Sequence, residues 1–184
     1  MPERSSGILL HITSLPGVEG TGTLGSEAFR FIDFLKNTEQ KYWQILPLGP
    51  VGYGNSPYQC YSAFAGNPLL IDLHELKTCL LLNDKDLTNI PRFRKTQIDF
   101  KKTACWKSTL LEKAFENFQK IQPDSLTEEY RQFLKEHNWW LCDYALFMSA
   151  RKYFKNVKWQ SWDDEIKYRN NNALIKYKEI LRQE

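Results

Sequence analysis

The sequence has no long apolar run, and it has few histidines and cysteines. Its apolar stretches cover only a few residues each, whereas a membrane-spanning helix needs roughly 20. The three histidines are scattered, and the four cysteines are widely spaced without a CxxC pair: Cys60, Cys79, Cys105 and Cys142. These features argue against a transmembrane helix, a disulfide framework and a metal site, and they predict reduced thiols.

Neither the N-terminus nor the charge distribution indicates export or a nucleic-acid partner. The first seven residues, MPERSSG, lack the charged-then-apolar layout of a signal peptide. The net charge of +3 is unevenly distributed, since residues 1–90 carry 6 Lys and Arg against 9 Asp and Glu, and residues 91–184 carry 19 against 13. In the basic half, charges of both signs alternate along amphipathic patterns, as on solvated helix faces. We therefore expect a cytoplasmic protein that binds neither nucleic acid nor membranes.

What the sequence does contain is an α/β pattern in its first half. The apolar runs Gly7–Ile12 and Tyr42–Leu48 are typical of strands buried on both faces. Between them, Ser26 resembles a helix N-cap with Glu27 in the first turn. Four apolar residues then fall at i, i+3, i+4 and i+7: Ala28, Phe31, Ile32 and Leu35. This order predicts a βαβ unit with parallel strands and a right-handed crossover.

The second half has the periodicity of helices, whose apolar stripes we interpret as core. Two segments match a helix-capping signature, Ser125 with Glu128 and Ser161 with Asp164. The predicted helices cover about 103–121, about 125–137, a segment that carries Trp140 to Met148, and a final segment that carries Leu174, Tyr177 and Leu181.

The most informative segment is the loop Gly52–Pro68, GYGNSPYQCYSAFAGNP. It combines aromatic rings and short polar side chains with glycines and prolines, and its irregular pattern fits neither helix nor strand. Aromatic faces pack on the C–H patches of a sugar, and small polar groups bond its hydroxyls. The loop therefore suits a carbohydrate ligand. The alternative from composition is a packed Gly/Pro loop with buried tyrosines.

Four long motifs occur in a fixed order along the chain. They are RSSGILLHITSLPG (Arg4–Gly17), YWQILPLGP (Tyr42–Pro50), GYGNSPYQCYSAFAGNPLLIDL (Gly52–Leu73) and WWLCDYALFMSARKYF (Trp139–Phe154). Together they closely resemble the N-terminal part of the 4-α-glucanotransferases, also called amylomaltases or disproportionating enzymes. The similarity is dense through residue 73 and around 139–154, and looser between these segments.

The resemblance implies a fold and a domain organisation. Members of this family have a (β/α)8 TIM barrel interrupted by helical insertions, so this chain would supply the first two strands, the intervening helix and a helical insertion subdomain. We place the barrel part at residues 1–76, with a substrate loop at 49–68, and the insertion at 77–184. Two parallel strands alone would leave sheet edges exposed, and the sequence stops inside a helical pattern. We therefore expect a chain truncated at its C-terminus.

The resemblance also implies a reaction that this chain would only partly encode. Family members move α-1,4-glucan segments between maltooligosaccharides by a retaining double displacement, which requires two facing carboxylates and no cofactor. The acids near the motifs, Asp33 and Asp72, do not correspond to the family's catalytic residues, and neither do Asp163 and Asp164. We expect those catalytic residues beyond Glu184, and the isolated chain to be inactive.

By the same resemblance, three residues of the loop would contact glucan. Tyr58 and Ser56 match residues beside the cleavage point, and Tyr53 matches a tyrosine of a second glucan-binding site in some members. Ala104 lies near a position where some members carry another aromatic for that second site. Two other readings stay open: a non-catalytic α-glucan-binding module, and an inactive interaction fragment. We take His11 as a core histidine and Asn67 as a residue that satisfies loop backbone.

Overall fold

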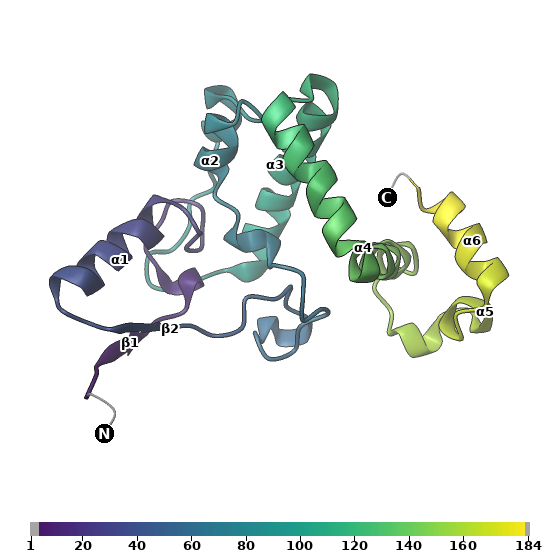
Figure 1. Ribbon diagram of the computed structural model, residues 1–184, viewed down its shortest axis with the longest axis horizontal. Helices are drawn as coiled ribbons and strands as arrows, with labels where there is room; N and C mark the ends of the chain where they lie inside the picture. Colours follow the sequence, from purple (N-terminus) through teal and green to yellow (C-terminus); the bar gives the residue numbers. More distant parts are fainter. Residues whose placement is uncertain (1–3, 183–184) are drawn as a thin grey trace. The chain divides into compact units, whose positions relative to one another are not determined.

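The computed structural model describes residues 4–182, and the chain divides into two compact units, residues 1–124 and 125–184. The first unit contains both strands, β1 (Gly7–Leu9) and β2 (Tyr42–Gln44), and three helices, α1 (Ser26–Asn37), α2 (Leu73–Thr78) and α3 (Phe100–Ile121). The second unit consists of helices (Figure 1). The boundary after residue 76 was predicted to separate part of a barrel from a helical insertion. It stays a prediction.

The first unit opens with the predicted βαβ arrangement. β1 and β2 pair in parallel with Ile8 opposite Trp43, and α1 connects them. Both strands are shorter than predicted, because the chain turns into a 3-10 helix at Ile12–Ser14 and becomes irregular after Gln44. The β1–α1–β2 prediction is confirmed in type and order.

Helix α1 begins at its predicted cap residue, one residue earlier than predicted. Ser26 is the first helical residue, and Gly25 is the N-cap without a side-chain hydrogen bond. A Cβ atom on Gly25 would lie 1.9 Å from the Asp72 carboxylate, so a larger residue would collide with that side chain. Asp72 thus requires a glycine at the helix start, which the local pattern did not reveal.

One core cluster of this unit lies between α1 and one face of the small sheet. It contains buried Ile12, Leu15, Ala28 and Leu70, with Leu10, Phe31, Trp43 and Leu48 packed around them. On the other face, Leu9 and Tyr42 are exposed in the part of the chain that the structure describes. The expectation of strands buried on both faces therefore holds for one face only. Parallel sheets are covered on both faces in complete α/β folds, so this unit is a partial α/β structure.

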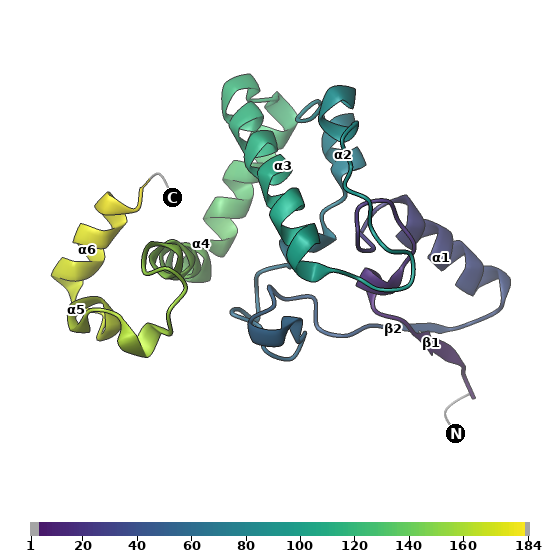
Figure 2. The ribbon, with the colours of Figure 1, turned by 180° about the vertical axis from the view of Figure 1, so that it is seen from behind.

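Helices α2 and α3 pack beside each other in the first unit (Figures 1 and 2). Asp72 caps α2, because its Oδ1 accepts from the backbone N–H groups of His74 and Glu75 at 2.9 and 3.2 Å. Asp99 caps α3 through the N–H of Lys102.

The second unit contains α4 (Asp124–Tyr153), α5 (Asp164–Lys167) and α6 (Asn171–Ile180). Its core includes Ala150, Trp162, Ile166, Ala173 and Tyr177.

Two predictions for the second unit are wrong. The two helices expected around residues 125–148 form one continuous helix, since nothing between them breaks the helical pattern. Neither proposed capping serine acts as a cap: Ser125 lies inside α4 and bonds Glu129, and Ser161 ends a 3-10 helix. Among residues 4–182, no helix is long and apolar enough to cross a membrane.

Candidate functional site

The loop Gly52–Pro68, which we call the aromatic loop, follows β2 along the chain. Its first part forms a small hairpin. An isolated antiparallel bridge joins Val51 to Cys60, and the N–H of Gly52 donates to the Gln59 carbonyl at 2.9 Å. The N–H of Tyr61 also donates to the Pro50 carbonyl at 3.0 Å. At the tip, Gly54 has a positive φ of 71°, a conformation that glycine adopts without strain. The tip is therefore presented on an ordered backbone.

The structure places the three predicted contact residues together at this tip. The side chains of Tyr53 and Tyr58 are 91% and 73% exposed. The Oγ of Ser56 accepts from the N–H of Tyr58 at 3.4 Å, so the serine also shapes the turn. Two exposed rings on one loop leave aromatic surface free to contact a ligand. The alternative of buried, packed tyrosines is wrong for Tyr53 and Tyr58.

The two ends of the loop are closed against each other. The N–H of Asn67 donates to the Leu48 carbonyl at 2.8 Å, and Asn67 Oδ1 accepts from the N–H of Leu69 at 3.0 Å. Asn67 thereby caps the 3-10 helix Pro68–Leu70. The prediction that Asn67 satisfies loop backbone is confirmed.

A buried ion pair lies next to the segment that follows the aromatic loop, and the sequence analysis did not predict it. Lys107 on α3 has a fully buried side chain, and its Nζ lies 2.8 Å from Oε2 of the equally buried Glu19. The signal was present, because Lys107 shares its helical face with buried Thr103, Leu110 and Ala114. A lysine on an apolar stripe predicts a buried acidic partner, but the sequence does not say which one.

A second carboxylate lies close to this pair. Asp72 Oδ2 accepts from the hydroxyl of Thr23 at 2.6 Å, which ties the cap of α2 to the loop after β1. Burial lowers the pKa of Lys107 below its usual range, while the charges of Glu19 and Asp72 oppose this shift. Gly20 makes the approach of α3 possible, because a Cβ there would lie 2.5 Å from Thr103 Oγ1.

His11 follows β1 at the end where the strand leaves the sheet. Its Nδ1 is buried without a hydrogen-bond partner among the described residues, and burial lowers the pKa of the ring. The interpretation as a satisfied core histidine is therefore wrong for this atom. The structure gives no chemical role to His11.

The other acids named in the sequence analysis are exposed or are paired with other side chains of the protein. Asp33 lies on the exposed side of α1, Asp163 accepts from the Tyr177 hydroxyl at 2.7 Å, and Asp164 pairs with Lys167. Over residues 4–182 there is also no group of three His, Cys, Asp or Glu that could hold a metal, and the four cysteines are free.

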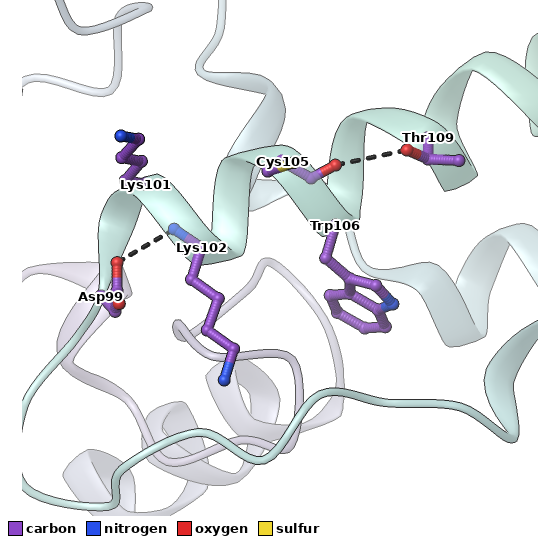
Figure 3. A pocket seen from close by; sticks show the side chains of 6 residues that line it. All are labelled: Asp99, Lys101, Lys102, Cys105, Trp106 and Thr109. Carbon is purple, nitrogen blue, oxygen red and sulfur yellow. Dashed lines mark hydrogen bonds between the residues drawn. The ribbon is translucent and has the colours of Figure 1, made fainter.

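A shallow hollow lies at the start of α3. Figure 3 shows Lys102 and Trp106 projecting from the same side of the helix above it. The Trp106 ring packs 5.7 Å from that of Phe93, and the Lys102 ammonium lies 5.4 Å from the same ring. These contacts pair the aromatic groups within the protein, so the hollow carries no binding assignment.

Comparisons with known proteins assign the chain to a family. The profile of a family described as 4-alpha-glucanotransferase matches residues 10–184. The 4-alpha-glucanotransferase of Synechocystis is 42% identical over 184 residues, which are all of this chain and 36% of that protein. The enzyme of Aquifex aeolicus is 46% identical over 173 residues, 93% of this chain and 34% of that protein.

A solved structure extends the similarity to three dimensions. The amylomaltase from Streptococcus agalactiae, in complex with acarbose, matches with a TM-score of 0.90 and 40% sequence identity. The match covers 98% of this chain and 36% of that one. The chain thus spans about a third of the length of the relatives it matches.

Proposed function

Because the chain belongs to the 4-alpha-glucanotransferase family, we propose that it supplies part of the glucan-binding surface of such an enzyme. The enzyme would move α-1,4-glucan segments between maltooligosaccharides by a retaining double displacement. The two carboxylates that this reaction requires would lie in the part of the family that this chain does not match. This chain would contribute binding and orientation of the sugar.

The observation that carries this proposal is the pair of exposed tyrosines on an ordered loop. Tyr58 and Tyr53 offer ring faces to solvent beside the hydroxyl of Ser56. A glucose ring packs its C–H face on an aromatic ring, and its hydroxyls pair with small polar groups. In this proposal Tyr58 and Ser56 contact the sugar next to the cleavage point, and Tyr53 contacts a more distant part of a long glucan.

The position of the loop is consistent with a barrel frame. We propose that β1 and β2 are the first two strands of a (β/α)8 barrel, that residues 1–76 form its first βαβ part, and that residues 77–184 form a helical insertion. Active sites of such barrels lie at the C-terminal ends of the strands. The aromatic loop follows the C-terminal end of β2, which supports a role at the substrate.

The proposal is tested by titrating the chain with maltoheptaose and following backbone amide signals by NMR. We expect shifts confined to residues 49–68. Tyr58→Ala should weaken binding by about 1 kcal/mol, roughly fivefold, because it removes one aromatic–sugar contact. Tyr58→Phe should retain most of the affinity, since the ring face remains.

Tyr168→Ala is the matched control for this titration. Tyr168 is 76% exposed but lies in the second unit, so its loss should leave maltoheptaose binding unchanged. Equal losses in the Tyr58 and Tyr168 variants, or no shifts at all in the loop, would contradict the proposed function.

A further inference from the structure

A single buried ion pair links three segments of the first unit that are far apart in the sequence. Lys107 of α3 lies 2.8 Å from Glu19 in the loop after β1, and their side chains are 0% and 5% exposed. The Lys107 ammonium also donates to the carbonyl of Leu69 at 2.8 Å. The pair therefore contacts the chain just where it leaves the aromatic loop.

Glu19 also bonds the backbone of this exit segment, residues 69–73. Its Oε1 accepts from the backbone N–H of Leu73 at 3.0 Å, so the pair holds one carbonyl and one amide four residues apart. Next to them, the N–H of Leu24 donates to the Leu70 carbonyl at 2.8 Å. Asn67 connects this fixed segment to the loop, because its N–H donates to the Leu48 carbonyl and so closes the base of the loop.

Stability alone does not account for this pair. Removing two charges from water costs much of what their attraction returns, and neutral replacements of a complete buried pair are often no less stable. Burial lowers the pKa of Lys107, which is the direction that desolvation of its ammonium gives. Charged, directional groups can add a defined geometry, because here Lys107 bonds the Leu69 carbonyl while Glu19 bonds the Leu73 amide.

We propose that Glu19 and Lys107 are positioning residues, which fix the exit of the aromatic loop and thereby hold Tyr53 and Tyr58 in the arrangement that binds glucan. Neither side chain reaches the surface, so both act only through the backbone at Leu69 and Leu73. This inference rests on the proposed function for its ligand, but the ordering of the loop is measurable without any ligand.

The experiment compares the wild-type chain with the double variant Glu19→Gln/Lys107→Met. This variant keeps the size of both side chains and leaves no buried charge unpaired, so the chain should remain folded. Its thermal unfolding midpoint should fall by a few degrees only, because the Leu69 carbonyl loses its donor. Amide hydrogen exchange at Asn67 and Leu73 should accelerate about tenfold or more, because local opening becomes easier. Maltoheptaose affinity should fall about tenfold while the chain remains folded.

Two further variants make the comparison specific. Glu116→Gln/Lys120→Met removes an exposed ion pair from the same helix, with side chains 65% and 72% exposed, and should change neither exchange nor affinity. If the first double variant does not fold, Glu19→Asp is used, because it keeps the charge of the pair and only shortens the side chain that reaches Leu73. The same changes are then expected in smaller size.

The outcomes separate this inference from the proposed function. Faster exchange at Asn67 with weaker maltoheptaose binding supports the positioning role. Unchanged exchange overturns it, and so does faster exchange with unchanged affinity, since the pair would then be structural only. If the wild-type chain does not bind maltoheptaose, the proposed function fails and the role in binding fails with it. The exchange rates still report whether the pair orders the loop.

Discussion

Lys107 illustrates how far a single residue can depart from its usual surroundings. Lysine is almost never fully buried unless it is paired, and here its ammonium has a carboxylate and a backbone carbonyl as partners. Its position on the apolar face of α3 can be read from periodicity. The identity of Glu19 as its partner cannot, because the sequence contains 22 acidic residues and periodicity does not rank them.

Tyr177 gives a prediction for the second unit at this scale. Burial, aided by its hydrogen bond to Asp163, raises the pKa of Tyr177 to about 12 from 10.0. The unfolded chain therefore loses this proton at lower pH than the folded chain, so stability falls as the pH rises from about 10 to about 12. Below pH 10 the contribution is fully present.

Tyr177→Phe should remove this contribution to the alkaline loss of stability. We also expect it to lower the free energy of unfolding at neutral pH by about 1 kcal/mol, through the lost hydrogen bond. Urea unfolding between pH 7 and 11 measures both effects. A variant that shows the same alkaline slope as the wild type would contradict the assignment.

At the scale of elements, the short helix α2 depends on its cap. Six residues are too few to form a stable helix in isolation, so its geometry relies on Asp72 and on packing against α3. Asp72 also accepts from Thr23, which connects the cap to the loop after β1. One side chain thus orders a helix start and a neighbouring loop.

Asp72→Ala should lower the free energy of unfolding by about 1–2 kcal/mol, since two backbone N–H groups at the start of α2 lose their acceptor. Asp33→Ala is the matched control, because Asp33 lies on the exposed side of α1 and should change stability by less than about 0.5 kcal/mol. Chemical denaturation of both variants provides the measurement. Equal effects would mean that the cap contributes nothing.

Element types were easier to predict than element boundaries. The βαβ order follows from local periodicity and occurs in the structure. The predicted apolar stripe of α1 is present at Ala28, Phe31 and Leu35, but Ile32 is 48% exposed, so that part of the prediction is wrong. The N-cap of α1 was misplaced because Gly25 is required by the Asp72 carboxylate, a contact across distant segments. Likewise α4 continues where two helices were expected, since capping signatures mark only possible helix starts.

At the scale of the whole molecule, the chain matches only about a third of its relatives. Its sheet has two strands with one covered face in the described part, which is the arrangement expected of a portion of a larger α/β fold. The chain belongs to the family because the family profile matches residues 10–184. Activity of this chain by itself is a separate prediction.

We predict that purified residues 1–184 do not disproportionate maltotriose, because the acids that we considered as catalytic candidates have capping, pairing or surface roles. A chimera that joins this chain to the remaining two thirds of the Aquifex aeolicus relative, 46% identical over the shared part, is the positive control and should release glucose. Glucose release by residues 1–184 alone would show that one of these acids is catalytic. It would refute the assignment of catalysis to the unmatched part.

The sequence by itself determined the family, the βαβ unit and the loop that carries Tyr53, Ser56 and Tyr58, because these depend on local composition and on motif order. Only the tertiary structure decided that the two tyrosines are exposed and that Glu19 and Lys107 meet behind the loop. The physical reason is that periodicity reports which face of an element is buried, but not which distant residue lies against it. A buried charge depends on that distant partner, so its role becomes readable only once the chain is folded.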